Sequence, residues 1–160
     1  MGKPAARITD TVAHPIPPVL TPGPGSFNVL IGNLPAWRGV PVATAAALQA
    51  AKKVADATIK VAEAASKAAA GTPAAPGLIA AEQATKASVA ASMSSTITSS
   101  AAGADIHICS TPLPVPPHGP GVVIDGSKTV LINGLPACRM GDTILEAVGP
   151  TNKITGGCTT

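Results

Sequence analysis

Two stretches of the chain, GSFNVLIGNLPAWR (residues 25–38) and GSKTVLINGLPACR (residues 126–139), align without a gap and agree at nine of their fourteen positions. Agreement over this length marks an internal repeat. In each copy the Val-Leu-Ile run is a short β-strand signal, and a Gly-Asn or Asn-Gly pair predicts a tight turn before Leu-Pro-Ala. The sequence therefore predicts a strand-turn-strand unit that is used twice.

A third copy is divided between the two ends of the chain. KPAAR (residues 3–7) repeats the end of the unit, and GGCTT (residues 156–160) stands where the unit begins. The linkers of residues 7–25 and 139–157 have the same length, and both open Arg-x-x-Asp-Thr. We therefore expect Cys158 to lie near Lys3, and three units to surround one axis in a compact cone. The residues of the repeat motif are Pro4, Arg7, Pro35, Arg38, Pro136 and Arg139.

The middle of the chain has a different composition. Residues 43–71 contain strong helix formers, no interior proline or glycine, and a terminating glycine, which predicts a long helix. A loop follows at residues 72–77, and a second helix is expected over about 78–98. Two helices joined by a short Pro/Gly loop form an antiparallel hairpin. The predicted fold is mainly β, with a discontinuous domain of residues 1–42 and 103–160 interrupted by a helical hairpin at 43–102.

Composition excludes several classes of protein. The chain of 160 residues has one Trp, one Phe and no Tyr, so a large conventional core is not expected. A net charge of +3, without a run of Lys or Arg, gives no indication of a nucleic-acid partner. No apolar run is long enough to predict a membrane span, and the first residues lack the apolar region of a secretory signal.

The histidines are the candidate metal ligands. His14, His107 and His118 all lie in the flanks, in Pro-rich or turn-like segments. Three imidazoles and one thiolate satisfy a tetrahedral Zn²⁺, and a site with four protein ligands is closed and structural. Such a site would stabilise a domain that has almost no aromatic core.

Two cysteines compete for the thiolate position. The repeat geometry would bring Cys158 towards the linkers, and we expect it to be the ligand. Cys109 is the alternative, because residues two apart on an extended strand, here His107 and Cys109, point to the same side. Cys138 occupies the position of Ala6 and Trp37 in the sister motifs, which predicts a packing role.

A catalytic metal site would require an open coordination position and a nearby general base. Glu146, Asp10 and Asp142 are the acidic residues considered for that role, and the two aspartates are better explained as caps of turns. The expectation is that the protein is not an enzyme, with a zinc hydrolase as the less favoured alternative.

Taken together, KPAAR, GSKTVLINGLPACRMGD, DIHICSTPLPVPPHGPG and ITGGCTT resemble the PAAR-repeat proteins, named for their Pro-Ala-Ala-Arg motif. The resemblance covers roughly 100 residues in the two flanks. It implies a conical β-fold whose tip holds zinc through three histidines and one cysteine, which by motif are His14, His107, His118 and Cys158. The order of the motifs is permuted, and the hairpin is an addition to the family pattern.

The resemblance also implies a partner. The base of the cone would cap the trimeric valine-glycine-repeat (VgrG) spike of a type VI secretion system or a related contractile injection system, and sharpen it for puncture of an envelope. The protein would assemble in the cytoplasm and be ejected with the spike without a signal peptide. As an alternative role, the helical hairpin would make the protein an adaptor for an effector or a chaperone.

Overall fold

The structure is a computed structural model that describes residues 2–14, 18–109 and 118–159. Its largest sheet is fully antiparallel and has the strand order β1-β4-β5-β8-β9. These strands are β1 (Pro22–Gly23), β4 (Ile106–Cys109), β5 (Gly119–Val123), β8 (Thr143–Glu146) and β9 (Asn152–Lys153). The combination of this sheet with two small sheets and two helices makes the chain a mixed α and β structure.

Each copy of the repeat forms a β-hairpin, as the sequence predicts. Strand β2 (Leu30–Ile31) pairs with β3 (Leu34–Pro35), and β6 (Leu131–Ile132) pairs with β7 (Leu135–Pro136). Both turn residues of each hairpin, Gly32-Asn33 and Asn133-Gly134, have positive φ. Glycine and asparagine tolerate this conformation best, which explains why the turn sequence is confined to these two residue types.

Backbone hydrogen bonds join the three repeat segments in a closed ring. Ala6, Trp37 and Cys138 hold the same position in the three segments. The N–H of Ala6 donates to the carbonyl of Cys138 at 2.9 Å, that of Trp37 to Ala6 at 2.9 Å, and that of Cys138 to Trp37 at 3.0 Å. The side chains of all three are buried in one apolar cluster with Ile144 and Val123. The predicted packing role of Cys138 is therefore confirmed.

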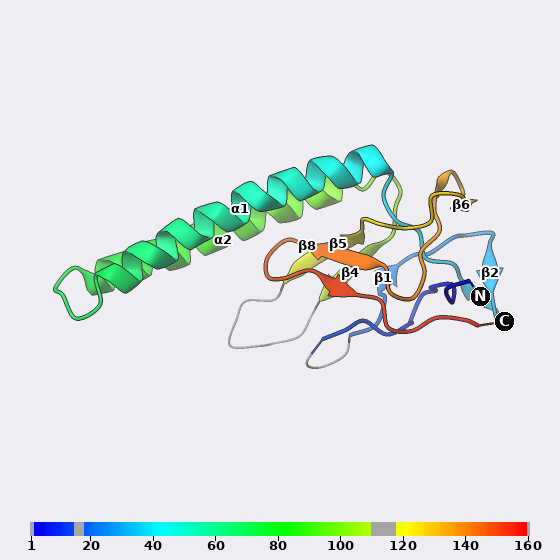
Figure 1. Cartoon of the computed structure of the whole chain (residues 1–160), viewed down its shortest axis with the longest axis horizontal. Helices are drawn as coiled ribbons and strands as arrows, with labels where there is room; N and C mark the ends of the chain where they lie inside the picture. The colour runs from blue at the N-terminus through cyan, green and yellow to red at the C-terminus, as the bar shows by residue number, and fades with distance from the viewer. Residues whose placement is uncertain (1, 15–17, 110–117, 160) are drawn as a thin grey trace.

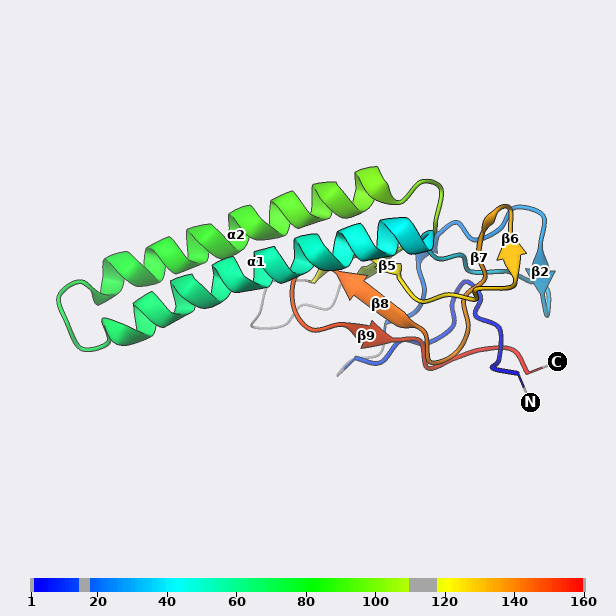
Figure 2. The same cartoon turned by 45° about the horizontal axis from the view of Figure 1, so that its top comes forward.

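The two ends of the chain meet in the way the divided repeat predicts. Ala5 and Cys158 exchange both backbone hydrogen bonds, at 3.0 and 2.8 Å. Both termini lie at the same end of the molecule as the hairpins β2-β3 and β6-β7 (Figures 1 and 2). We call this end the base.

Helices α1 (Val42–Ala68) and α2 (Ala75–Ser100) form the predicted antiparallel hairpin. Helix α2 begins three residues earlier than expected, because Pro76 lies in its first turn, where a missing N–H costs nothing. On α1 Ala55 is buried, as are Ala45 and Leu48, whereas the neighbouring Val54 is exposed. No described helix combines the length and the apolarity required to cross a membrane.

The sheet supports only one half of the helical hairpin. The beginning of α1 and the end of α2 share a core with β5 and β8, formed around Leu48, Met93, Ile97, Val122 and Leu145. The other half extends away from the base beyond the β-strands (Figures 1 and 2). Because this core is shared, the division into a flank domain and a separate hairpin stays a prediction.

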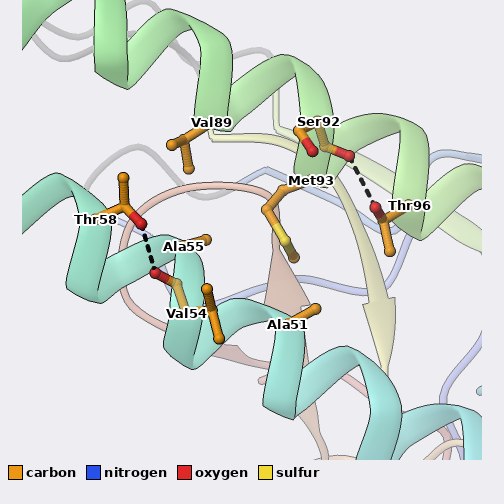
Figure 3. A pocket seen from close by; sticks show the side chains of 8 residues that line it. All are labelled: Ala51, Val54, Ala55, Thr58, Val89, Ser92, Met93 and Thr96. Carbon is orange, nitrogen blue, oxygen red and sulfur yellow. Dashed lines mark hydrogen bonds between the residues drawn. The ribbon is translucent and has the colours of Figure 1, made fainter.

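Between the two helices lies an open groove with a volume of about 380 Å³. Its lining is apolar or hydroxylic, and Met93 points into it between Ala55 and Ala51 (Figure 3). The hydroxyls of Thr58 and Thr96 donate to helix carbonyls four residues earlier, at 3.0 and 2.9 Å. The groove therefore contains no group suited to acid-base or metal chemistry.

Candidate metal centre

Four side chains from separate segments converge where β4 ends, β5 begins and β8 ends. They are those of His14, Cys109, His118 and Glu146, and their ligand atoms all lie within 4.8 Å of one another. The sheet register explains how they meet. Cys109 pairs with Gly119, next to His118, while Gly121 pairs with both His107 and Glu146.

Gly121 allows the side chains of its two neighbours to approach each other. His107, Gly121 and Glu146 are in register across three adjacent strands, so their side-chain positions share one face of the sheet. A Cβ at Gly121 would lie 2.8 Å from Cγ of Glu146. With glycine there, Nε2 of His107 comes within 3.8 Å of Oε1 of Glu146.

Distances within the cluster fit a single small cation. Nε2 of His14 lies 3.0 Å from Nδ1 of His118 and 3.4 Å from Sγ of Cys109. Oε2 of Glu146 is 2.8 Å from Nδ1 of His118 and 4.0 Å from Nε2 of His14. Ligand bonds of about 2.0–2.3 Å in a tetrahedral zinc site place neighbouring donor atoms about 3.3–3.8 Å apart. Small shifts of these side chains would therefore complete such a site.

Several polar atoms in the cluster or beside it are buried and have no hydrogen-bond partner of normal geometry: Nδ1 of His14, Oε1 of Glu146, and both ring nitrogens of the neighbouring His107. Buried polar groups are usually paired, so each unpaired atom requires an explanation. A cation near Glu146 would balance its buried carboxylate. The donor set, two imidazoles with a thiolate and a carboxylate, is one that zinc accepts.

Burial controls the protonation of two groups at the centre. It lowers the pKa of His107 to about 4, which the backbone of Val19 opposes and the nearby His14 reinforces. His107 is therefore neutral at pH 7. Burial also raises the pKa of Glu146, while the hydrogen bond from Asn152 and the proximity of His118 act in the opposite direction. Neutral imidazole is the form that binds a metal.

The structure separates the predicted ligands into two groups. His14 and His118 are in the cluster, His107 is beside it, and the alternative thiolate Cys109 is the cysteine present. Cys158, the first choice from the sequence, lies instead at the base, paired with Ala5 and close to Gly32. Arg7 lies near Cys158 at the base. The pKa of Arg7 is raised, chiefly by its hydrogen bond to Asp10 and to a smaller extent by Cys158.

Sequence reasoning did not assign Glu146 as a ligand. It was considered only as a general base, because a carboxylate at the end of an apolar strand carries no spacing signal. Asn152, which donates to Oε2 of Glu146 at 2.8 Å, was also missed. The alternation of burial along β4, in which His107 and Cys109 are buried and Ile108 is exposed, does confirm that these two residues point to the same side.

Comparison with known proteins provides no relative for this site. No protein-family model matches the chain, and neither a curated protein nor a solved structure matches it significantly.

Proposed function

We propose that this chain is a PAAR-repeat protein that caps the trimeric VgrG spike of a type VI secretion system or a related contractile injection system. Its β-part would be the pseudo-threefold cone of that family, with a structural Zn²⁺ at the apex and no enzymatic activity. The cap would assemble in the cytoplasm and leave the cell with the spike. The observation that carries this proposal is the closed ring of hydrogen bonds through Ala6, Trp37 and Cys138.

A threefold ring within one chain suits a threefold partner. The end of a trimeric β-spike exposes strand edges from three identical chains, and unpaired edges must be covered. One chain with three similar segments can meet all three edges at once. A homotrimer of this chain is not required for that match.

The base also offers apolar contact area. Phe27, Leu30, Val130 and Leu131 are all more than half exposed, on or beside the two β-hairpins. Hydrogen bonds from Ser26 and Asn133 link the two hairpins at this end. Large exposed apolar side chains that gather at one end indicate an interface.

The zinc proposal rests on the cluster at the other end of the sheet. The side chains of His14 and Glu146 are at most 1% exposed, and that of His118 is 12% exposed. Four protein donors would fill a tetrahedral shell and leave no position for substrate, which favours a structural ion over a zinc hydrolase. Such an ion would hold together the strand ends and loops that meet there.

Co-purification with candidate spike trimers tests the proposal. The expected complex contains one chain per trimer and one zinc per chain, measured by native mass spectrometry and elemental analysis. The double variant Leu30→Asp/Leu131→Asp at the base should abolish the complex. Val61→Asp, a matched change on the exposed part of α1, should leave it intact. A free homotrimer, or a complex indifferent to the base variant, would overturn the proposal.

A second role is favoured by the part of the helical hairpin that extends beyond the strands. In this part Lys86 of α2 pairs with Glu63 of α1 at 2.9 Å and with Glu82 at 2.6 Å. A hairpin that projects away from the base remains accessible when the base is occupied, as an adaptor for an effector or chaperone would require. Replacing residues 60–88 with a short glycine-rich turn should preserve spike binding and abolish recruitment of such cargo.

A further inference from the structure

Helix α1 contains a seven-residue repeat that neither the base nor the metal centre uses. Residues 53–59 read KVADATI, residues 60–66 read KVAEAAS, and a third unit begins with KAAA at residue 67. The first two units agree in their lysine, their valine and two alanines, and each carries one acidic residue at the same offset. A seven-residue period places equivalent side chains on one face of a helix.

The acidic residues of the repeat are paired within the molecule, whereas the lysines are not. Asp56 forms an ion pair with Lys52, and Glu63 pairs with Lys86 of α2 at 2.9 Å. The lysines of the repeat are exposed, and among the described residues none of them has an ion-pair or hydrogen-bond partner: Lys53, Lys60 and Lys67. This face of α1 therefore carries three positive charges without counter-charges.

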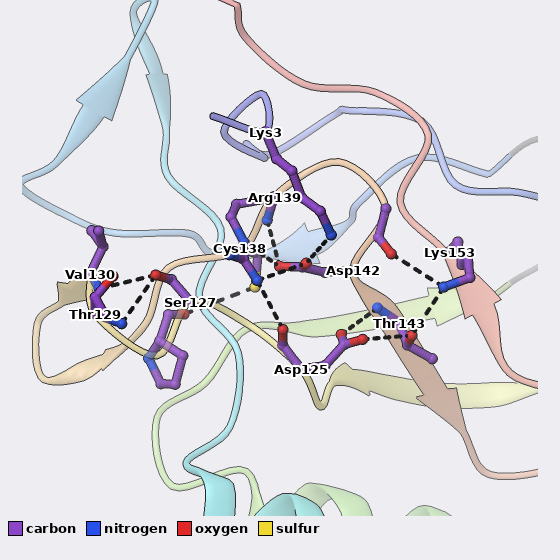
Figure 4. Close-up of polar contacts among 12 residues, drawn as sticks. Lys3, Asp125, Ser127, Thr129, Val130, Cys138, Arg139, Asp142, Thr143 and Lys153 are labelled. Carbon is purple, nitrogen blue, oxygen red and sulfur yellow. Dashed lines mark hydrogen bonds and ion pairs between the residues drawn. The ribbon is translucent and has the colours of Figure 1, made fainter. Parts of the chain in front are cut away.

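Most lysines elsewhere in the described chain have partners. Lys3 pairs with Asp142 at 3.7 Å, and Lys153 donates to the hydroxyl of Thr143 at 3.4 Å (Figure 4). Outside the repeat, only Lys128 is also without such a partner in the described part of the chain. The unpaired lysines are thus concentrated on α1, in a row about 21 Å long.

Beside the lysines, the same face of α1 is apolar and open to solvent. Val54 and Val61, which each follow a lysine of the repeat, are 69% and 72% exposed. Four alanines complete the face and are exposed as well: Ala50, Ala57, Ala64 and Ala68. These six positions alternate in steps of four and three residues, as in a coiled coil, and the lysines hold the flanking g positions. We call the six apolar residues and the three lysines the α1 seam.

The α1 seam borders the groove between the two helices. Val54 belongs to the seam and also lines the groove, together with Val89 and Met93 of α2 (Figure 3). A third helix laid along the seam could extend its apolar side chains into this groove and its charged side chains over the lysines. Alanine at every second seam position lets two helix axes approach closely, near the lower end of the usual range of about 8–10 Å.

We propose that the α1 seam binds an acidic amphipathic helix of a second protein. Its aliphatic side chains would pack against Val54 and Val61, and its carboxylates would pair with the three lysines of the repeat. The inference rests on the proposed adaptor role of the helical hairpin and names the chemistry of the cargo that it recruits. An amphipathic helix in a groove is a common mode of recognition.

Two other occupants fit the α1 seam less well. A second copy of this chain would bring further lysines to the lysine row, while the acidic residues of its α1 are already paired. A helix that lies on a membrane surface carries Trp, Phe or Leu on its apolar face, whereas this face has only valine and alanine. An acidic helix complements both the charge and the small side chains of the seam.

A synthetic peptide tests the α1 seam directly. The probe is a fluorescently labelled peptide of three heptads, each Glu-Leu-Ala-Ala-Leu-Glu-Ala, measured by anisotropy against the full chain. It should bind saturably, with one peptide per chain, and about tenfold more weakly at high salt, which screens the ion pairs. The matched control has Lys in place of every Glu and should not bind. Binding of both peptides, or of neither, would overturn the proposal.

Variants of the chain identify where the peptide binds. Val61→Asp places a carboxylate in the seam and should weaken binding of the acidic peptide about tenfold or more. Ile79→Asp, at an exposed position of α2 that does not line the groove, is the matched control and should have no effect. Equal affinity of the peptide for these two variants would contradict the proposal.

Reversing the lysine row tests the charge complementarity. The triple variant Lys53→Glu/Lys60→Glu/Lys67→Glu should lose the acidic peptide and bind the lysine peptide, a reversal that damage to the fold could not produce. Lys128→Glu, outside the helices, should keep the original preference. A triple variant that retains its helical circular dichroism and still prefers the acidic peptide would refute the assigned role of the lysines.

The spike and the peptide distinguish this proposal from the cap. Leu30→Asp/Leu131→Asp at the base should lose the spike and keep the peptide, whereas Val61→Asp should lose the peptide and keep the spike. If the peptide binds the seam and no spike binds, the cap fails and the seam stands. If a spike binds and the peptide does not, the seam fails and the cap stands. A dimer of the chain, or binding to phosphatidylserine vesicles, that Val61→Asp abolishes would overturn the seam proposal.

Discussion

Asp105 binds Arg38 in the same way as Asp10 binds Arg7 and Asp142 binds Arg139, although 67 positions separate Asp105 from Arg38. In every pair the aspartate accepts the arginine backbone N–H and two guanidinium N–H groups. The other two pairs are three residues apart. The helical hairpin is therefore inserted inside an Arg-x-x-Asp turn, which keeps its geometry.

Asp105→Ala tests the importance of this contact. Asp105 is fully buried, and its hydrogen bond raises the pKa of Arg38. Loss of the carboxylate would leave the buried guanidinium without its counter-charge and should lower the free energy of unfolding by about 3–5 kcal/mol in urea titrations. Glu63→Ala, at the partly exposed Glu63–Lys86 pair between the two helices, should cost less than about 1 kcal/mol. Similar losses in the two variants would refute the structural role of Asp105.

The three cysteines should differ sharply in zinc binding. Cys109→Ser removes the thiolate of the cluster and should lower zinc affinity, whereas Cys158→Ser and Cys138→Ser should retain one zinc per chain. Substitution of Co²⁺ should give a thiolate charge-transfer band that only Cys109→Ser abolishes. If Cys158→Ser abolished the band instead, the cluster would not be the metal site.

The fourth ligand can be identified by comparing Glu146 with His107. Glu146→Gln keeps the shape of the side chain but removes a charged donor, and should reduce zinc affinity by more than the roughly 10–100-fold typical of outer-shell changes. The reduction in zinc affinity caused by His107→Gln should fall within that outer-shell range. Both affinities can be measured by competition with a chromophoric chelator. If His107→Gln reduced zinc affinity more than Glu146→Gln did, His107 would be the fourth ligand, in agreement with the ligand set that the family resemblance implies.

Gly149 should be required for the position of His118. It has a φ of +82°, and an added Cβ would lie 2.9 Å from Nε2 of His118. Gly149→Ala should therefore weaken zinc binding as well as stability. Gly134 has a similar φ of +78° and open space around it, so Gly134→Ala should cost only the backbone strain of about 1–2 kcal/mol. Unchanged zinc affinity in Gly149→Ala would contradict this account.

The attachment of the helical hairpin to the sheet can be measured with Ile97→Ala. Ile97 is fully buried in the core shared with β5 and β8, and the truncation should lower the free energy of unfolding by about 2–5 kcal/mol. Val61→Ala, at an exposed position on the projecting half, should change it by no more than about 0.5 kcal/mol. Equal effects would mean that the two halves of the hairpin are supported equally.

Local sequence signals predicted the elements of this fold better than its site. Repetition and turn chemistry are local, so the hairpins, the helices and the meeting of Ala5 with Cys158 could be predicted. Glu146 could not, because its role depends on Gly121 leaving room across the sheet. The choice between Cys109 and Cys158 likewise depends on which end of the fold each occupies, and the repeat alone does not contain that information.

The insertion between Arg38 and Asp105 makes the far end of the helical hairpin a place to add sequence. A helical hairpin returns the chain to its starting point, so its length adds little to the entropy of closing the Arg38–Asp105 turn. Gly71, beyond α1, has open space around it and no contact with the strands. A foreign domain inserted there would be carried on a rigid arm without entering the ring, the metal centre or the base.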